Sequence, residues 1–460
     1  MIRLLLIISF FITTAYSKEL VIKNKINPQD FAYSIKNIST GESWSKNADK
    51  SFNFASVNKL ITATIALDEL GPDFKFRTSF FSNNQIRENK LLGDLIIKGE
   101  GDPTLSIENL KDIFNSFKAR GIKQITGNIF LDDSYFKFQP NPEYIDDLNY
   151  RAYNVQPKSL LIEAGAIEVQ FLNQDDNVYL FTKPFIKEIE VINNLKITNK
   201  VCEDWKSKIH PDLTFTDELI QVILNGSFSK SCKNKSLYLN ALNQDEYFKV
   251  AIKNILNQAD IEFNGEIQKK SFADDDLNSF VLLHEHFSDP LNQLMYQMNK
   301  FSLNLFSRNL ALAVMKQKTE FEADEFNTDI FFKSWFEKKE INFNEFFIEN
   351  GAGLSRSSYA NTLLFQEVLT FIVESDWKSE IISTLPIAGI YGTLKTMFKG
   401  KSCSNPTHLK TGRLKNVFAL SGFMKSSKGE EYIVTFVLNG PQYQSFLKFI
   451  EQSLDYLYQH

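Results

Sequence analysis

The segment Asn53–Gly71, NFASVNKLITATIALDELG, carries a serine and a lysine at the head of a run that is otherwise almost entirely apolar. The apolar residues after the lysine fall on every side of a helix, which is typical of a helix buried in a core. A Gly-Pro pair follows and ends the run. We therefore predict a buried helix over Ser56–Leu70 that holds Lys59 in its first turn.

Ser56 and Lys59 are three residues apart, a spacing that places the lysine amine on the same helix face as the serine hydroxyl. A serine hydroxyl is a weak nucleophile until a neighbouring base takes its proton. A lysine can be that base only when it is neutral, and burial and a second cation both lower its pKa. The Ser-x-x-Lys spacing recurs elsewhere in the chain, but only this copy opens a buried helix.

A second motif, Lys410-Thr411-Gly412, occurs once and lies on a predicted strand. Its lysine would supply the second cation and attract an anionic end of a substrate. Glycine at position 412 would let a substrate backbone lie close against the strand. The triplet is also compatible with an ordinary strand end.

A third motif, Ser302-Leu303-Asn304, falls between two predicted helices with apolar flanks. Polar side chains in such a place need partners, because burying them alone costs free energy. The hydroxyl of Ser302 could relay a proton to a leaving amine, and the amide of Asn304 could hold a substrate carbonyl. The alternative is a solvated turn between helices.

Composition narrows the class of protein. The chain has 460 residues, 43% hydrophobic and 23% charged, which is typical of a globular protein of two or three domains. A net charge of −5 without a basic run argues against nucleic acid as a partner. Gly-x-Ser-x-Gly, phosphate-loop and metal-ligand spacings are missing from the sequence, so we expect no metal and no cofactor.

The first 17 residues are typical of a signal peptide, with a basic start, a short apolar stretch and Ala-Tyr-Ser before the cleavage point. We expect cleavage near Ser17 and export to the periplasm or outer cell envelope; an uncleaved anchor helix is the alternative. Later stretches are too short to span a bilayer, so we expect no integral membrane span. Export permits a disulfide between Cys202 and Cys232, although these and Cys403 could all stay free thiols.

Local patterns indicate the order of the remaining elements. A hairpin is expected over 31–46, and short strands over 162–198. An acidic linker over 273–279 suggests a boundary. Continuous strands are predicted over 91–98, 124–132 and 261–268, helices over 106–120, 245–258 and 290–315 (one or two), and three strands between 407 and 439. A final amphipathic helix over 443–458 is expected to pack on the sheet, because its polar face is not strongly basic; a membrane-surface helix is the alternative.

The three motifs, in this order and after a signal peptide, resemble the set found in β-lactamases and penicillin-binding proteins. The chain is further similar to the D-alanyl-D-alanine carboxypeptidase/endopeptidase family of DacB type, low-molecular-mass penicillin-binding proteins with a large insertion. The long separation between Ser56 and Ser302 fits that insertion. The segments LGPDFKFRTSF, GEGDPTL, GNIFLDDSYF, NGAGLSR and LPIAGIYGTL also resemble family segments in family order.

The resemblance implies an α/β (α+β) fold: a transpeptidase domain like that of β-lactamases and penicillin-binding proteins, with an antiparallel sheet flanked by helices and a large mixed α/β insertion. It divides the chain into a catalytic domain, 18–76 and 280–460, and an inserted region, 77–279, with a smaller domain nested within it. It also places Cys202 and Cys232 where the family often has a cysteine pair.

The resemblance also implies roles for individual residues. Ser56 would be acylated with Lys59 as its base, and the N–H groups of Ser56 and Arg413 would form the oxyanion hole. Ser302 would pass a proton to the departing amine and Asn304 would hold the peptide carbonyl. Lys410 and Thr411 would hold the terminal carboxylate.

The roles of two residues, Arg413 and Asp102, are left open by the sequence. The family usually has Thr or Ser where this chain has Arg413, so the arginine either pairs with the substrate carboxylate or points away. Asp102 could meet a cationic side chain of the substrate, but a turn-forming aspartate is the commoner role.

The expected function is a serine-type D-Ala-D-Ala carboxypeptidase or endopeptidase that acts on peptidoglycan stem peptides or their cross-links and is acylated by β-lactam antibiotics. A β-lactamase and a catalytically weak peptidoglycan-binding scaffold are the alternatives. The sequence does not separate carboxypeptidase from endopeptidase, and it does not define the diamino acid of the stem peptide or the oligomeric state.

Overall fold

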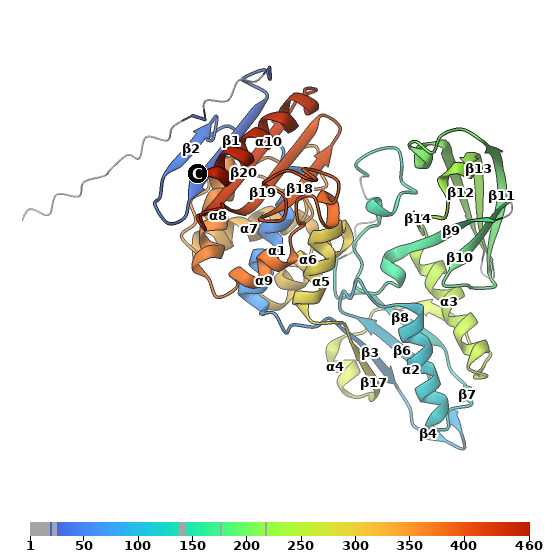
Figure 1. Cartoon of the computed structure of the whole chain (residues 1–460). Coiled ribbons are helices and arrows are strands. Elements are labelled where there is room, and N and C mark those ends of the chain that lie inside the picture. Colours follow the sequence, from blue (N-terminus) through green and yellow to red (C-terminus); the bar gives the residue numbers. More distant parts are fainter. Residues whose placement is uncertain (1–18, 21–24, 138–143, 175–176, 217–218) are drawn as a thin grey trace, which may run out of the picture.

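A computed structural model of the chain describes residues 19–20, 25–137, 144–174, 177–216 and 219–460. One half of the molecule is built around a sheet whose strands come from the N-terminal and C-terminal parts of the described chain (Figure 1). The other half is formed by residues 77–287. The predicted signal peptide, 1–17, lies outside the described residues. Among those that are described, no helix has both the length and the apolar character needed to cross a bilayer.

The first half is an antiparallel five-stranded sheet in the order β18-β19-β20-β1-β2. Successive residues of each strand point to opposite faces, and apolar side chains occur on both faces. Each face therefore requires a cover of helices. The C-terminal helix covers one face, and the buried helix of the opening motif and helix α8 lie against the other. The elements are β1 (Phe31–Asn37), β2 (Ser43–Lys46), β18 (Thr407–Leu414), β19 (Val417–Lys425), β20 (Glu431–Asn439), α1 (Lys59–Leu70), α8 (Thr362–Glu374) and α10 (Tyr443–Gln459).

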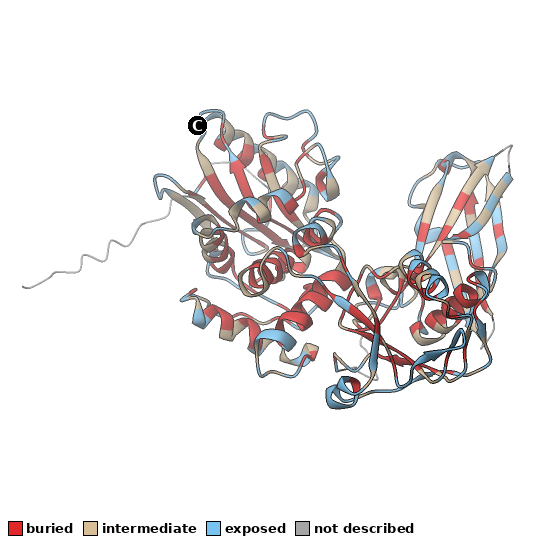
Figure 2. Cartoon of the chain, turned by 90° about the horizontal axis from the view of Figure 1, so that it is seen from below, coloured by how far each residue is buried: buried red, intermediate tan, exposed pale blue. Residues whose placement is uncertain are grey.

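The helices of this half carry intermediate and exposed residues among the buried ones, and α1 is buried along most of its length (Figure 2). Every residue of α1 from Lys59 to Leu67 is buried, as its all-round apolar pattern predicts. The single or double helix predicted after residue 290 is two helices, which meet at Ser302. The remaining elements of this half are the 3-10 turns η1 (Ala55–Asn58), η6 (Glu325–Asn327) and η7 (Gly392–Leu394) and the helices α5 (Leu291–Phe301), α6 (Asn304–Lys318), α7 (Thr328–Lys338) and α9 (Lys378–Thr384).

The inserted region has a five-stranded mixed sheet in the order β16-β8-β6-β3-β17 and a small sheet in the order β15-β7-β5-β4. Its elements are β3 (Arg77–Ser82), β4 (Ile86–Arg87), β5 (Lys90–Leu91), β6 (Leu95–Gly99), β7 (Gln124–Ile125), β8 (Ile129–Asp132), β15 (Glu262–Phe263), β16 (Ile267–Lys269), β17 (Val281–Phe287), α2 (Ile107–Ala119), α3 (Gln244–Gln258) and α4 (Asp274–Asn278).

The prediction of three continuous strands over 91–98, 124–132 and 261–268 was wrong, because each is two short strands in different sheets. A glycine lies at each break. A Cβ at Gly127 would lie 2.5 Å from the backbone of Gly93, and one at Gly265 would lie 2.2 Å from the carbonyl of Gly127. The three segments therefore pass from one sheet to the other side by side, and their backbones are in contact at these glycines.

Helix α4 and strand β17 lie at the C-terminal boundary of the inserted region. The acidic segment predicted as a linker contains the short helix α4. Strand β17 follows it and pairs with β3, so the sheet of the inserted region extends to Phe287. The domain division stays a prediction, and this pairing moves its proposed second boundary to between Phe287 and Leu291.

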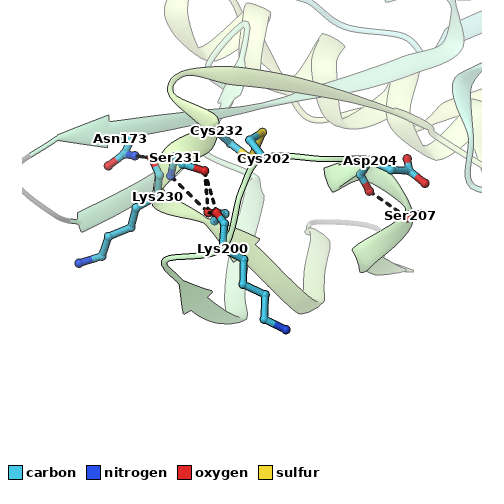
Figure 3. Close-up of a disulfide and its surroundings, with 9 residues drawn as sticks. Asn173, Lys200, Cys202, Asp204, Ser207, Lys230, Ser231 and Cys232 are labelled. Carbon is cyan, nitrogen blue, oxygen red and sulfur yellow. Dashed lines mark hydrogen bonds between the residues drawn. A yellow bond between two sulfur atoms is a disulfide. The ribbon is translucent and has the colours of Figure 1, made fainter.

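Two three-stranded sheets, β10-β9-β14 and β11-β13-β12, form the nested part of the inserted region. A disulfide joins Cys202 to Cys232, and Ser231 donates to the carbonyl of Lys200 over 2.8 Å beside it (Figure 3). The elements are β9 (Ala166–Gln174), β10 (Asn177–Lys183), β11 (Ile189–Thr198), β12 (Ile209–Phe215), β13 (Ile220–Ser229), β14 (Lys235–Asn240), η2 (Ala152–Asn154), η3 (Glu163–Gly165), η4 (Trp205–Lys208) and η5 (Lys230–Cys232).

Candidate active site

The turn that carries Ser56 is held by its own neighbours. Ala55 adopts a left-handed conformation with φ of 47°, which is costly for a residue with a Cβ. The side-chain oxygen of Asn53 accepts from the Ala55 N–H at 2.8 Å, and its amide donates to the carbonyl of Ser355 at 2.9 Å. Ser56 therefore lies in a 3-10 turn, and Lys59 is the first residue of α1.

The amine of Lys59 has three close partners and no exposure to solvent. Its Nζ lies 2.8 Å from Ser56 Oγ, 2.8 Å from Asn304 Oδ1 and 2.9 Å from the carbonyl of Ala352. The amide nitrogen of Asn304 donates to the carbonyl of Tyr153 at 3.1 Å, so its oxygen must face the lysine. The oxygens of Asn304 and Ala352 can therefore only accept hydrogen bonds. An amine in its neutral form that donates to both of them would direct its lone pair to the Ser56 hydroxyl.

The surroundings of Lys59 favour that neutral form. Burial is the main cause that holds the pKa of its amine well below the usual value, and the positive charges of Lys410 and Arg308 lower this pKa further. The sequence pointed to Lys410 as the second cation. It missed Arg308, whose guanidinium is fixed by Glu325 at 2.5 Å.

The second and third motifs meet beside this pair. Lys410 is buried and donates to Ser302 Oγ at 2.9 Å and to the carbonyl of Thr411 at 2.8 Å. Burial lowers the pKa of the Lys410 amine to about 7. Ser302 ends α5 in a left-handed conformation with φ of 60°, a second costly backbone position next to a serine of the cluster. The hydroxyl of Thr411 lies 2.8 Å from that of Thr393.

Position 412 requires glycine for a reason within the protein. A Cβ there would lie 2.2 Å from the carbonyl oxygen of Phe54. The close approach at Gly412 in this structure is made by the chain that leads into Ser56, and it brings β18 against the 3-10 turn; an approach by a substrate backbone stays a prediction. Strand β18 is also the edge of its sheet; beyond a bridge between Ile387 and His408 at its start, its outer side has no strand partner among the described residues.

The side chain of Arg413 points away from the cluster. Its guanidinium lies 4.7 Å from the ring centre of Tyr443 and 5.8 Å from that of Phe418. Both rings belong to the side of the sheet that α10 covers, opposite α1. Of the two arrangements left open by the sequence, this structure contains the second.

Asp102 is not part of the cluster. It is buried in a turn of the inserted region, where Oδ1 accepts from the N–H of Thr104 at 2.7 Å and from its hydroxyl at 2.6 Å. Its Oδ2 lies 3.8 Å from His286 Nε2 and has no hydrogen-bond partner among the residues that the structure describes. Burial raises the pKa of this carboxyl to about 6. Its contacts are those of a turn-forming residue.

Two further contributors to the cluster were not singled out in the sequence. Tyr153 and Ala352 act through backbone carbonyls, which leave no signature in residue type. The segment NGAGLSR, which contains Ala352, was quoted only for its family resemblance, and Tyr153 follows residues with no motif at all. The inserted region therefore reaches the cluster through Tyr153, as a structural partner of Asn304.

A serine hydroxyl on a buried amine, with a second buried amine on an edge strand beside it, is suited to acyl transfer through serine. The comparisons agree with that class. The model of the D-Ala-D-Ala carboxypeptidase 3 (S13) family matches residues 17–459, and the chain belongs to this family of serine carboxypeptidases.

One relative and two solved structures show how far the similarity extends. The D-alanyl-D-alanine carboxypeptidase DacB of Haemophilus influenzae is 28% identical over 400 residues, 84% of this chain and 80% of that protein. The crystal structure of penicillin binding protein 4 (dacB) from the same organism matches with a TM-score of 0.77 and 24% identity, covering 95% of this chain and all (100%) of that one. A second structure of it, complexed with a β-lactam, has a TM-score of 0.73, 24% identity and coverage of 94% and 96%. The last two show the fold.

Proposed function

We propose that this protein hydrolyses the D-Ala-D-Ala end of peptidoglycan stem peptides, or the cross-links made from it, through an acyl-enzyme at Ser56. The observation that carries the proposal is the set of contacts around Lys59. Burial and neighbouring positive charges lower the pKa of this amine, and a neutral amine that donates to the two acceptor-only oxygens would direct its lone pair to the serine hydroxyl. That is the protonation state a general base requires.

The proposed reaction uses the side chains of Ser56, Lys59, Ser302 and Lys410. Lys59 takes the proton of Ser56, whose oxygen attacks the carbonyl carbon of the penultimate D-Ala. The N–H groups of Ser56 and Arg413 would stabilise the oxyanion, and the contact between Gly412 and Phe54 supports this by bringing the two backbones together.

The leaving group departs on the side of the second amine. Ser302 receives a hydrogen bond from Lys410 and can pass a proton to the departing nitrogen. Lys410 and Thr411 would hold the terminal carboxylate, and Asn304 would orient the peptide carbonyl. Water then hydrolyses the ester. Because peptidoglycan lies outside the cytoplasmic membrane, this function requires export, for which residues 1–17 are the proposed signal.

β-Lactams are proposed as acylating inhibitors of the same serine. When Ser56 attacks the β-lactam carbonyl, the ring C–N bond breaks but the amine stays tethered to the acyl group. The opened antibiotic would therefore remain attached to the serine as an ester. The β-lactam complex of the related penicillin binding protein 4 supports this proposal.

Intact-mass spectrometry after incubation with benzylpenicillin tests the function. We expect one adduct, mapped by digestion to Ser56, and release of D-Ala from a defined pentapeptide. Ser56→Ala removes both signals. Ser43→Ala is the matched control, because it changes a Ser-x-x-Lys copy on strand β2 and should leave both signals intact.

Three results would contradict the proposal. An adduct that persists in Ser56→Ala would place the nucleophile elsewhere. An adduct that hydrolyses within seconds, with no action on pentapeptide, would indicate a β-lactamase. Binding of muropeptides that Ser56→Ala retains, without any adduct in the unchanged protein, would indicate a scaffold.

A further inference from the structure

Three exposed aromatic rings form a cluster at one side of the catalytic residues. Tyr296, Phe301 and Tyr391 are 39%, 50% and 38% exposed, unusually open for rings that contact one another. The ring centres of Tyr296 and Tyr391 are 6.2 Å apart, and those of Phe301 and Tyr391 are 5.9 Å apart. We call these three residues the aromatic shelf.

The shelf is held in place from below. The buried amine of Lys300 lies 5.2 Å from the ring centre of Tyr296 and 5.7 Å from that of Tyr391, and it donates to the carbonyl of Leu385. Gly392 follows Tyr391 with φ of 70°, and a Cβ there would lie 2.7 Å from the carbonyl oxygen of Lys300. The loop that carries Tyr391 is therefore fixed against the end of α5, and the rings form a preorganised surface.

The shelf adjoins the leaving-group side of the site. Phe301 directly precedes Ser302, which faces the departing amine in the proposed reaction. Thr393, two residues after Tyr391, is hydrogen-bonded to Thr411, which would hold the terminal carboxylate. A leaving group that is larger than one D-Ala must extend from these two contacts toward the shelf.

We propose that the aromatic shelf binds the second stem peptide of a cross-link, so that the enzyme prefers cross-linked substrates to free pentapeptides. This inference rests on the proposed function. A departing D-Ala ends at the carboxylate, so in this proposal it makes no contact with the rings. A departing stem peptide also presents the methylene chain of its diamino acid and alanine methyl groups, which are apolar surfaces that aromatic rings bind in water.

The chemical step is unchanged by the shelf. The amide C–N bond of the cross-link breaks, the acyl–oxygen bond to Ser56 forms, and the serine proton reaches the departing nitrogen. Water then cleaves the ester and returns the proton to the enzyme. The shelf binds only the amine product of the first step, so it should act on the choice of leaving group and not on acylation by a β-lactam.

The test compares kcat/KM for a defined cross-linked muropeptide dimer with that for the monomeric pentapeptide. In Tyr391→Ala and Phe301→Ala we expect kcat/KM for the dimer to fall about tenfold, the equivalent of about 1.4 kcal/mol. Values for the pentapeptide and the rate of penicillin acylation should change less than about twofold, because neither substrate contacts the shelf in this proposal. Tyr391→Phe retains the ring and should retain the preference.

Phe326→Ala is the matched control, because it removes an exposed ring from η6. It should change kcat/KM neither for the dimer nor for the pentapeptide. If dimer and pentapeptide fall equally, or if the dimer does not change, the inference is wrong although the unchanged protein is still acylated. If the unchanged protein is not acylated by penicillin at all, the proposed function has failed, and the inference fails with it.

Discussion

Buried lysines serve opposite purposes in the two halves of the molecule. In the catalytic half, Lys59 and Lys410 contact hydroxyl, amide and carbonyl oxygens, and across the described ranges neither forms an ion pair. In the inserted region, Lys98 lies 2.6 Å from a carboxylate oxygen of Asp274, and Lys158 lies 2.5 Å from one of Asp245.

The difference shows how one side chain becomes either a base or a structural link. Burial penalises the charged form of an amine, and a carboxylate partner compensates for the penalty. Without that partner the pKa of the amine falls, so its neutral form, which can accept a proton, becomes more populated. In the inserted region, carboxylates pair with Lys98 and Lys158 and connect the segments that carry them. In the other half, Lys59, Lys300 and Lys410 are buried against hydroxyl, amide and carbonyl oxygens, with no carboxylate partner among the described residues.

Removal of the amine should produce the largest effect on activity. Lys59→Met keeps a long flexible side chain but leaves Ser56 without a base, so the rate of penicillin acylation should fall by about 10²–10⁴. Stopped-flow or mass-spectrometric acylation kinetics measure it, with circular dichroism to verify the fold. Acylation at an unchanged rate would show that another group activates the serine.

Conversion of Lys59, the proposed base, into a paired lysine should produce the next largest effect. Asn304→Asp puts a carboxylate on the Lys59 amine, as in the inserted region, and an adjacent opposite charge typically raises such a pKa by about 1–3 units. Below the new pKa the acylation rate should fall about tenfold for each unit of the shift and recover as the pH rises. Asn304→Ala is the control, because it loses the amide without adding charge and should leave the pH profile in place.

Removal of a paired lysine should affect stability and not catalysis. Lys158→Met leaves the carboxylate of Asp245 without its partner, and we expect a loss of about 1–3 kcal/mol in the free energy of unfolding of the inserted region. Chemical denaturation followed by fluorescence measures this. The acylation rate of the folded enzyme should be unchanged. A variant that is fully stable but slow to acylate would connect Lys158 to the catalytic cluster.

The smallest expected effect is on the pH dependence of stability. The folded-state pKa of Lys410 is about 7, whereas an unfolded lysine titrates near 10.4, so the unfolded chain binds the extra proton between these values. Stability from this group therefore increases as pH rises from about 7 toward 10, and Tm should rise by about 1–3 °C for that contribution. Lys410→Met should flatten the rise; an equal slope in both proteins would argue for a charged Lys410.

Much of the local structure follows from short-range pattern. The buried helix, the hairpin of β1 and β2, and helices α2 and α3 agree with their predicted ranges within a few residues, because hydrophobic period and capping residues act locally. The three strands that break at glycine were predicted as continuous. Their interruption depends on the contact of Gly93, Gly127 and Gly265 with one another, which is invisible in any one segment.

The sequence by itself determined the family, the order of the three motifs and the choice of Ser56 as the candidate nucleophile, since these depend on residue type and spacing. Only the tertiary structure decided that the amine of Lys59 lies among oxygens contributed from 245 and 293 residues away, next to Arg308 and Lys410. The reason is physical: the pKa of an amine depends on the dielectric and charges around it, and these are set by which distant segments pack against the helix.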